Sequence, residues 1–248
     1  MRRLSAAALA LGMICPLLAE GPAERFAQTT SLQRIDFAAG GTVRWNSSYG
    51  DLYIEGWDQP SVEIAVIKST NFYERSEVEK NSARLETIGV AVNRRSDTDL
   101  EISTTLPKRK HRVPPMSSQT KNKVTMEYRI RLPRNSRLMI DHRGGMVTAG
   151  NVMGDIDVAN RDGDIMLLLP EKGSYAIDAR SKMGHIASDF DGKTLSRYLV
   201  GQRFVGTGPA SARRIHLRTG FGGITILALP PEGEALSTAD GEITGGRK

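Results

Sequence analysis

The chain has 248 residues, of which 39% are hydrophobic, and it contains 25 glycines and one cysteine. This composition is that of a globular protein in one or two domains, and it excludes collagen-like, disulfide-stapled and wholly disordered chains. The formal net charge of +6 is too small to indicate nucleic-acid binding unless the basic residues cluster.

The N-terminal segment has the three-part layout of a secretory signal peptide. Arg2 and Arg3 precede a mostly apolar run over residues 4–18, and Ala19 stands before a polar stretch. A transmembrane helix needs about 20 apolar residues, so this shorter run favours a cleaved leader. We predict a signal peptide over residues 1–19, with Ala23 as a second cleavage position, and a mature chain of 248 − 19 = 229 residues.

The one cysteine of the chain, Cys15, lies inside this leader. The mature protein is therefore expected to form neither disulfide bonds nor thiolate metal sites. No other segment has the length of apolar sequence that a membrane span needs, about 20 residues. We expect an exported protein, periplasmic or at the cell surface, that carries no cofactor and no transmembrane segment.

We predict a linker over residues 20–34 and a single β domain over residues 35–245. Apolar residues alternate with polar ones from residue 35 onward, which is typical of strands with one buried face. The first apolar positions are Ile35 and Phe37; Val43 and Trp45; Leu52 and Ile54; Val62, Ile64 and Val66; Ile88, Val90 and Val92; Leu100 and Ile102, which Thr104 follows at the same spacing. Residues 124–132 show the clearest alternation and predict a strand with one dry and one wet face.

Residues 74–86 differ from this pattern. They lack glycine and proline, are rich in charge, and place Val78 and Leu85 seven residues apart. This spacing predicts one short amphipathic helix packed on a sheet.

Beyond residue 134, short apolar alternations each follow a glycine. The glycines are Gly145, Gly154, Gly163, Gly173, Gly184 and Gly223, with further units at Gly50 and Gly241. From 145 to 184 they are 9, 9, 10 and 11 residues apart. Because glycine adopts the positive φ that tight corners require, the pattern predicts an all-β fold of stacked short strands, β-solenoid-like or β-helix-like. A sandwich or meander with glycine turns is the alternative.

Three stretches together resemble a known family. They are Gly41–Asp58, with its Gly-Trp-Asp corner; Tyr128–Pro133, a strand that ends in proline; and the Gly-Asp-Ile units, including Asn160-Arg-Asp-Gly-Asp-Ile165. In this order they resemble the bacterial putative-adhesin domain family over roughly residues 35–245. The resemblance implies an exported, non-enzymatic scaffold or adhesin-like module of the cell envelope or surface, with β-solenoid-like structure. It implies no defined ligand and no catalytic residues.

Three Asp-x-Asp pairs lie in or beside the repeats, at Asp155 and Asp157, Asp162 and Asp164, and Asp189 and Asp191. Carboxylates two residues apart share one face of a strand or one turn, where they could bind Ca²⁺. The paired glycines and the further Gly-x-Asp of calcium-binding nonapeptide repeats are absent. We therefore expect these side chains to accept hydrogen bonds within glycine turns, and we predict no metal site.

No catalytic motif stands out, and we predict no enzyme activity. The four histidines (His111, His142, His185 and His216) are dispersed, and the nucleophile-elbow and phosphate-loop motifs are absent. The alternative function is a polysaccharide-binding or polysaccharide-cleaving β-helix protein. Its candidate catalytic residues would be Asp155, Asp157 and Asp164 with Arg161 or Arg180.

The basic excess is concentrated in one segment that contains no acidic residue. Its six cations are Lys108, Arg109, Lys110, Arg112, Lys121 and Lys123. The segment carries +6, whereas the mature chain carries 6 − 2 = +4, so the remainder carries −2. We interpret it as a loop between two strands, with an anionic lipid or polysaccharide surface of the envelope as its possible partner. Nucleic acid is not expected, because aromatic residues do not interleave with the cluster.

The C-terminal residues 241–246, Gly-Glu-Ile-Thr-Gly-Gly, resemble the start of a further repeat unit. An incomplete terminal unit leaves unpaired backbone groups at the end of a stack. The sequence therefore predicts self-association through a C-terminal edge.

Overall fold

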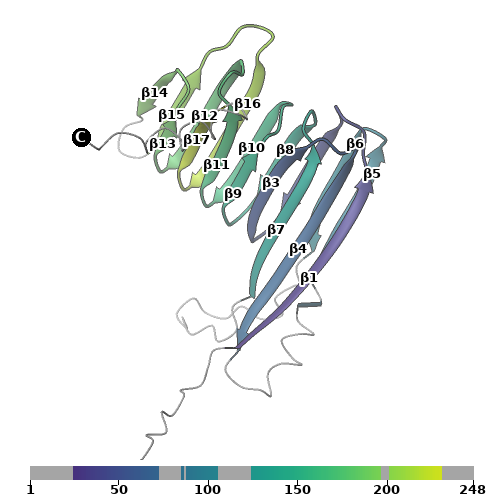
Figure 1. The fold of residues 1–248 in the computed structure, drawn as a ribbon. Coiled ribbons are helices and arrows are strands. Elements are labelled where there is room, and N and C mark those ends of the chain that lie inside the picture. The colour runs from purple at the N-terminus through teal and green to yellow at the C-terminus, as the bar shows by residue number, and fades with distance from the viewer. Residues whose placement is uncertain (1–24, 73–84, 87, 106–123, 197–200, 231–248) are drawn as a thin grey trace, which may run out of the picture.

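The computed structural model describes residues 25–72, 85–86, 88–105, 124–196 and 201–230. These residues form 17 strands in two mixed sheets that enclose one hydrophobic core (Figure 1). The predicted all-β class is confirmed. Within the described residues, no helix is long and apolar enough to cross a membrane.

The strands divide into an eight-stranded and a nine-stranded sheet. In spatial order, the first contains β1 (Arg25–Asp36), β4 (Ser61–Phe72), β7 (Val124–Pro133), β3 (Asp51–Trp57), β9 (Val147–Gly150), β11 (Ile165–Pro170), β17 (Ile224–Leu229) and β13 (Ile186–Ser188). The second contains β14 (Lys193–Ser196), β15 (Gln202–Gly206), β12 (Tyr175–Met183), β16 (Arg213–Phe221), β10 (Ile156–Asp162), β8 (Arg137–His142), β2 (Thr42–Ser47), β6 (Asp99–Thr105) and β5 (Gly89–Ser96).

Alternation of apolar and polar residues determines which face of each strand is buried. In β7, Met126, Tyr128 and Ile130 are buried while Thr125 and Arg129 are exposed, as the sequence predicts. The inward rows of both sheets meet in a single core. Each strand has one buried and one exposed face, which explains why the two sheets pack against each other as two layers.

Six two-strand units build the parallel part of the fold. Each unit starts in the nine-stranded sheet and continues into the eight-stranded one, and the units are stacked in the order β6–β7, β2–β3, β8–β9, β10–β11, β16–β17 and β12–β13. Neighbouring units pair in parallel; β10, for example, lies between β8 and β16. Because this order departs from chain order twice, the predicted β-solenoid-like arrangement is not confirmed.

Antiparallel strands close both ends of the stack. At one end β4 pairs with β7 and β1 pairs with β4, while β5 pairs with β6 in the other sheet. At the opposite end β15 pairs with β12, and β14 pairs with β15. Figure 1 shows β1 and β4 as a long antiparallel pair that extends beyond the stack.

Stacked glycines form the corners at which five of the units pass between the sheets. Gly50, Gly145, Gly163, Gly222 and Gly184 follow one another along the stack, with φ between 119° and 156°. A Cβ on Gly163 would lie 2.1 Å from the carbonyl oxygen of Gly145, and one on Gly145 would lie 2.3 Å from that of Gly50. Both the positive φ and the close stacking therefore require glycine.

The prediction of a glycine at each corner is confirmed for Gly50, Gly145, Gly163 and Gly184. In the unit predicted at Gly223 the positive φ belongs to Gly222 instead. Gly154 and Gly173 do not have positive φ. At Gly154 the requirement is close approach, because a Cβ there would lie 2.2 Å from the carbonyl oxygen of Ser136.

Two predicted boundaries change. Residues 25–34, predicted as linker, belong to β1, and the stretch Gln28–Arg34 is exposed on both faces. A strand that is exposed on both faces shows no alternation of apolar and polar residues. The sequence pattern therefore did not predict this strand. Of the helix predicted over residues 74–86, the structure describes only Leu85 and Glu86, so this helix is not confirmed.

Candidate functional site

Carboxylates of the three Asp-x-Asp pairs bind backbone groups of neighbouring units. Asp164 Oδ1 accepts a hydrogen bond from Gly223 N at 2.7 Å, and Asp155 Oδ1 accepts one from Arg214 N at 2.9 Å. Asp189 likewise accepts a bond from the backbone of β17. These bonds reach the backbone of another unit, whereas the prediction placed them within the turn of each aspartate itself. Among the described residues, no group of three or more His, Cys, Asp and Glu side chains suited to a metal occurs.

Asp155 also forms an ion pair with the Arg214 guanidinium at 2.9 Å. Burial alone would raise the pKa of Asp155, but the hydrogen bonds and charge of Arg214 outweigh it and hold that pKa below its usual range. The group is therefore an ionised anchor between β10 and β16.

Three arginines lie side by side on the outer face of the nine-stranded sheet. Arg218 of β16, Arg180 of β12 and Arg203 of β15 are register partners on adjacent strands. Like charges in such positions repel, and Asp178 offsets this repulsion. Its Oδ2 lies 2.7 Å from Arg180 Nη2, and its Oδ1 lies 2.9 Å from Arg203 Nε. The hydrogen bond from Arg180, followed by that from Arg203, holds the pKa of Asp178 far below its usual range.

Three further cations continue this face toward the glycine corners. Arg143 follows β8, Arg161 lies on β10 and Lys182 lies on β12; all three are exposed. In the described part of the chain, none of them forms an ion pair. We define the basic face as Arg143, Arg161, Arg180, Lys182, Arg203 and Arg218. With the neighbouring Asp141, Asp157 and Asp178, its formal charge is 6 − 3 = +3.

A row of buried polar side chains runs beneath the glycine corners, one from each strand. Its members, in register, are Ser47, His142, Asn160, Thr219 and Ser181. Asn160 Nδ2 donates to the Gly145 carbonyl at 2.9 Å, and Thr219 Oγ1 donates to that of Gly163 at 2.9 Å. These bonds satisfy corner carbonyls, so the row has a structural role. The sequence pattern did not predict this row.

His142 is the titratable member of the row. Its Nδ1 lies 2.5 Å from Ser47 Oγ, which accepts a hydrogen bond from Trp45 Nε1 at 2.7 Å. The Ser47 hydroxyl can donate to Nδ1 in the neutral tautomer that carries its proton on Nε2. Burial lowers the pKa of His142, and the backbone at Gly50 and Gly144 opposes this only in part.

We expect the free energy of unfolding to fall as the pH drops below about 6.5, because the unfolded imidazole then takes up a proton that the buried one resists. This contribution is complete above pH 6.5, and its loss reaches about 1.4 kcal/mol per pH unit below it. His142→Asn, which introduces the residue type that Asn160 supplies on the adjacent strand, should flatten the dependence between about pH 5.5 and 7. Urea denaturation at several pH values measures this. The exposed His216→Asn serves as control and should keep the slope of the parent; an unchanged slope in His142→Asn would contradict the assignment.

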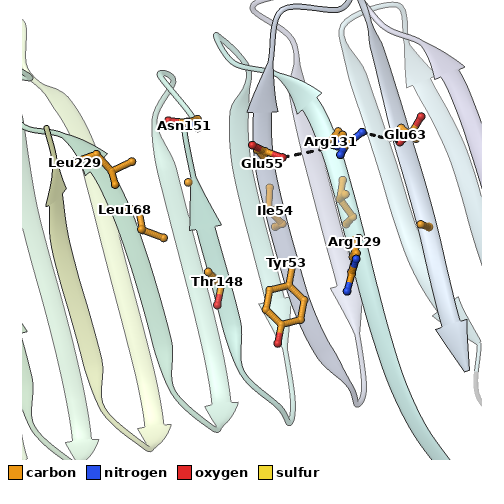
Figure 2. Close-up of a pocket in the computed structure, with 13 residues that line it drawn as sticks. Tyr53, Ile54, Glu55, Glu63, Arg129, Arg131, Thr148, Asn151, Leu168 and Leu229 are labelled. Carbon is orange, nitrogen blue, oxygen red and sulfur yellow. Dashed lines mark ion pairs between the residues drawn. The ribbon is translucent and has the colours of Figure 1, made fainter. Parts of the chain in front are cut away.

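A hollow of about 500 Å³ lies on the outer face of the eight-stranded sheet (Figure 2). Gly150 leaves a gap there, between its register partners Glu55 and Leu168. Figure 2 shows Arg131 between Glu55 and Glu63, at 3.7 and 3.5 Å. The acidic and basic groups of this hollow balance, so it offers no charge preference. The basic face is the more distinctive surface.

The chain is similar to two solved structures and matches no known family. No family model and no curated protein matches the chain. A putative cell adhesion protein from Clostridium sporogenes ATCC 15579 is similar with a TM-score of 0.48 and 13% identity, over 82% of this chain and 99% of that one. A putative adhesin from Bacteroides fragilis NCTC 9343 is similar with a TM-score of 0.23 and 11% identity, over 80% and 97%.

The structure gives the residues that the sequence pattern grouped as catalytic candidates different contacts. Arg161 and Arg180 belong to the basic face, and Asp157 pairs with Arg218 at 3.4 Å. Asp155 and Asp164 instead bind backbone groups of the stack. The candidate catalytic group is thus divided between surface ion pairs and structural bonds.

The six cations of the basic segment between residues 108 and 123 lie outside the described residues, as do the predicted leader and the C-terminal edge. The basic face is a different group of cations. Its members come from segments far apart in the sequence, so no local cluster of charged residues predicts them.

Proposed function

We propose that this chain is an exported, non-catalytic, adhesin-like module that presents its outer sheet faces to another component of the cell envelope or surface. One observation carries the proposal. The basic face places six cations on one side of a stack whose backbone is held by parallel and antiparallel strand pairing and by glycine corners. A broad charged face of this kind suits attachment to an extended surface better than enclosure of a small substrate.

The positions of the carboxylates support a non-catalytic role. A hydrolase of polysaccharides needs two carboxyl groups that converge on one bond of the substrate. Asp155 and Asp164 are occupied by hydrogen bonds to the backbone of β16 and of the turn before β17, and Asp178 is shared by two arginines. None of the three is free to change its protonation during a reaction without loosening the stack.

Export is proposed from the leader over residues 1–19. When the full chain is produced in a Gram-negative host, we expect it outside the cytoplasm, with the mass of residues 20–248. A chain that starts at residue 20 is the control and should stay in the cytoplasm. Cell fractionation and mass spectrometry of the intact protein measure both.

The exported protein should also sediment with isolated envelope fragments and remain in the supernatant without them. A full-length chain that stays in the cytoplasm with its leader intact would contradict the proposal. So would an exported chain that never sediments with envelope material.

A further inference from the structure

The centre of the basic face is a gap where a side chain is missing. Gly220 of β16 lies between Arg161 of β10 and Lys182 of β12, because the flanking residues of these strands are register partners. A Cβ at Gly220 would lie 2.5 Å from the carbonyl oxygen of Arg161, so the close approach of the strands keeps this position empty. Arg218, two residues earlier, completes a ring of three cations around the gap.

Two hollows meet at this gap. One, of about 460 Å³, extends from Asp141 and Arg143 to Gly220. The other, of about 510 Å³, extends from Lys182 and Arg218 to Gln202 and Arg203. Both are lined by Lys182, Arg218 and Thr219, so they adjoin, and we call the two together the trough, which lies across β8, β10, β16, β12 and β15. Five strands span about 19 Å at the usual strand spacing.

The cations of the trough are not all neutralised. Arg180 and Arg203 share Asp178, and Arg218 has only the 3.4 Å contact with Asp157. Arg143, Arg161 and Lys182 add three charges with no ion pair among the described residues. A ligand with several anionic groups in a line would pair with these charges across successive strands.

The lining distinguishes a polymer from a membrane. Ala159 is the one apolar residue among the groups that line the two hollows, and the remainder are cations, polar side chains, glycines and Asp141. Membrane-surface docking needs apolar anchors beside the cations. The exposed Phe221 and Met183 lie at the corners and outside this lining.

On these grounds we propose that the trough binds a linear acidic polysaccharide, with carboxylate or sulfate groups on successive units, laid across the strands. This proposal rests on the proposed function, since it names the envelope component that the module contacts. It assigns Arg161, Lys182 and Arg218 as the central contacts and Arg143, Arg180 and Arg203 as the flanking ones.

The test is calorimetric titration at low ionic strength with polygalacturonate and dextran sulfate, and with neutral dextran as the uncharged probe. The trough variant is Arg161→Gln with Lys182→Gln, whose side chains are exposed and without ion pairs in the described structure. The matched variant is Arg137→Gln with Lys172→Gln, which removes the same charge from exposed positions outside the trough lining that also form no ion pair in the described structure. We expect the parent to bind both acidic polymers, more weakly as salt is added, and not to bind neutral dextran. The trough variant should bind about 30-fold more weakly, equivalent to about 2 kcal/mol, and the matched variant should bind like the parent.

Three results would overturn the proposal: no binding of either acidic polymer by the parent, equal losses in the two variants, or binding to phosphatidylglycerol vesicles alone. The last would assign this surface to a membrane. Each can occur while the exported protein still sediments with envelopes, so failure of the trough and failure of the proposed function are distinguishable. Circular dichroism of both variants verifies that the fold is retained.

Discussion

Gly145→Ala is expected to destabilise the protein by about 3–5 kcal/mol. Gly145 has φ of 124°, which an L-residue rarely adopts. Its Cβ would lie 2.3 Å from the carbonyl oxygen of Gly50, in the adjacent corner of the stack. The backbone of both units would have to move apart, which would also stretch the bond from Asn160 Nδ2 to the Gly145 carbonyl. Chemical denaturation followed by circular dichroism measures the loss.

The neighbouring residue provides a control at the same corner. Gly144 has no positive φ, and its Cβ would lie 3.7 Å from the nearest atom, in the ring of Tyr49. Gly144→Ala should therefore change the free energy of unfolding by less than about 1 kcal/mol. Similar losses in the two variants would mean that the stacking of the corners does not determine stability.

The local pattern of the sequence predicts the layers but not the order of the units. In β10 and β12, alternation correctly separates inward Val158 and Ala179 from outward Asp157 and Arg180. Alternation cannot determine which strands are neighbours. Val158 and Ala179 could pair with each other as well as each pairs with Leu217 of β16, which lies between them in the structure. Each unit has the same apolar interior. No local pattern in the sequence therefore indicates that β16–β17 lies between β10–β11 and β12–β13.

The candidate site depends on that order, which is why the sequence could not reveal it. Arg161, Lys182 and Arg218 become neighbours only because β16 lies between β10 and β12. Taken singly, each is an ordinary outward cation of a strand. The hydrogen bonds of Asp164 and Asp189 depend on the same order, because they join these carboxylates to backbone groups 59 and 39 residues away in the sequence.

Trp45 connects the core to the buried polar row. It is 1% exposed, and its ring packs edge-on against Tyr128 with centroids 5.0 Å apart. Its Nε1 donates to Ser47 Oγ at 2.7 Å, and Ser47 in turn contacts His142. Removing the ring would lose apolar contact area and would also leave the polar row without one of its donors.

Trp45→Ala is therefore expected to cost about 3–5 kcal/mol of unfolding free energy. The second tryptophan is the matched control, because Trp57 is only partly buried and lies under Arg34 and Arg131 at 5.5 and 5.8 Å from its ring. Trp57→Ala loses contacts of that kind, worth about 0.5–1 kcal/mol each at exposed sites, and should cost less than half as much. Urea denaturation above pH 7, where His142 is neutral in folded and unfolded chains alike, measures both without the contribution from protonation. If Trp57→Ala proved the more damaging of the two, the antiparallel pair of β1 and β4 and its surroundings, and not the interior of the stack, would dominate the stability of this fold.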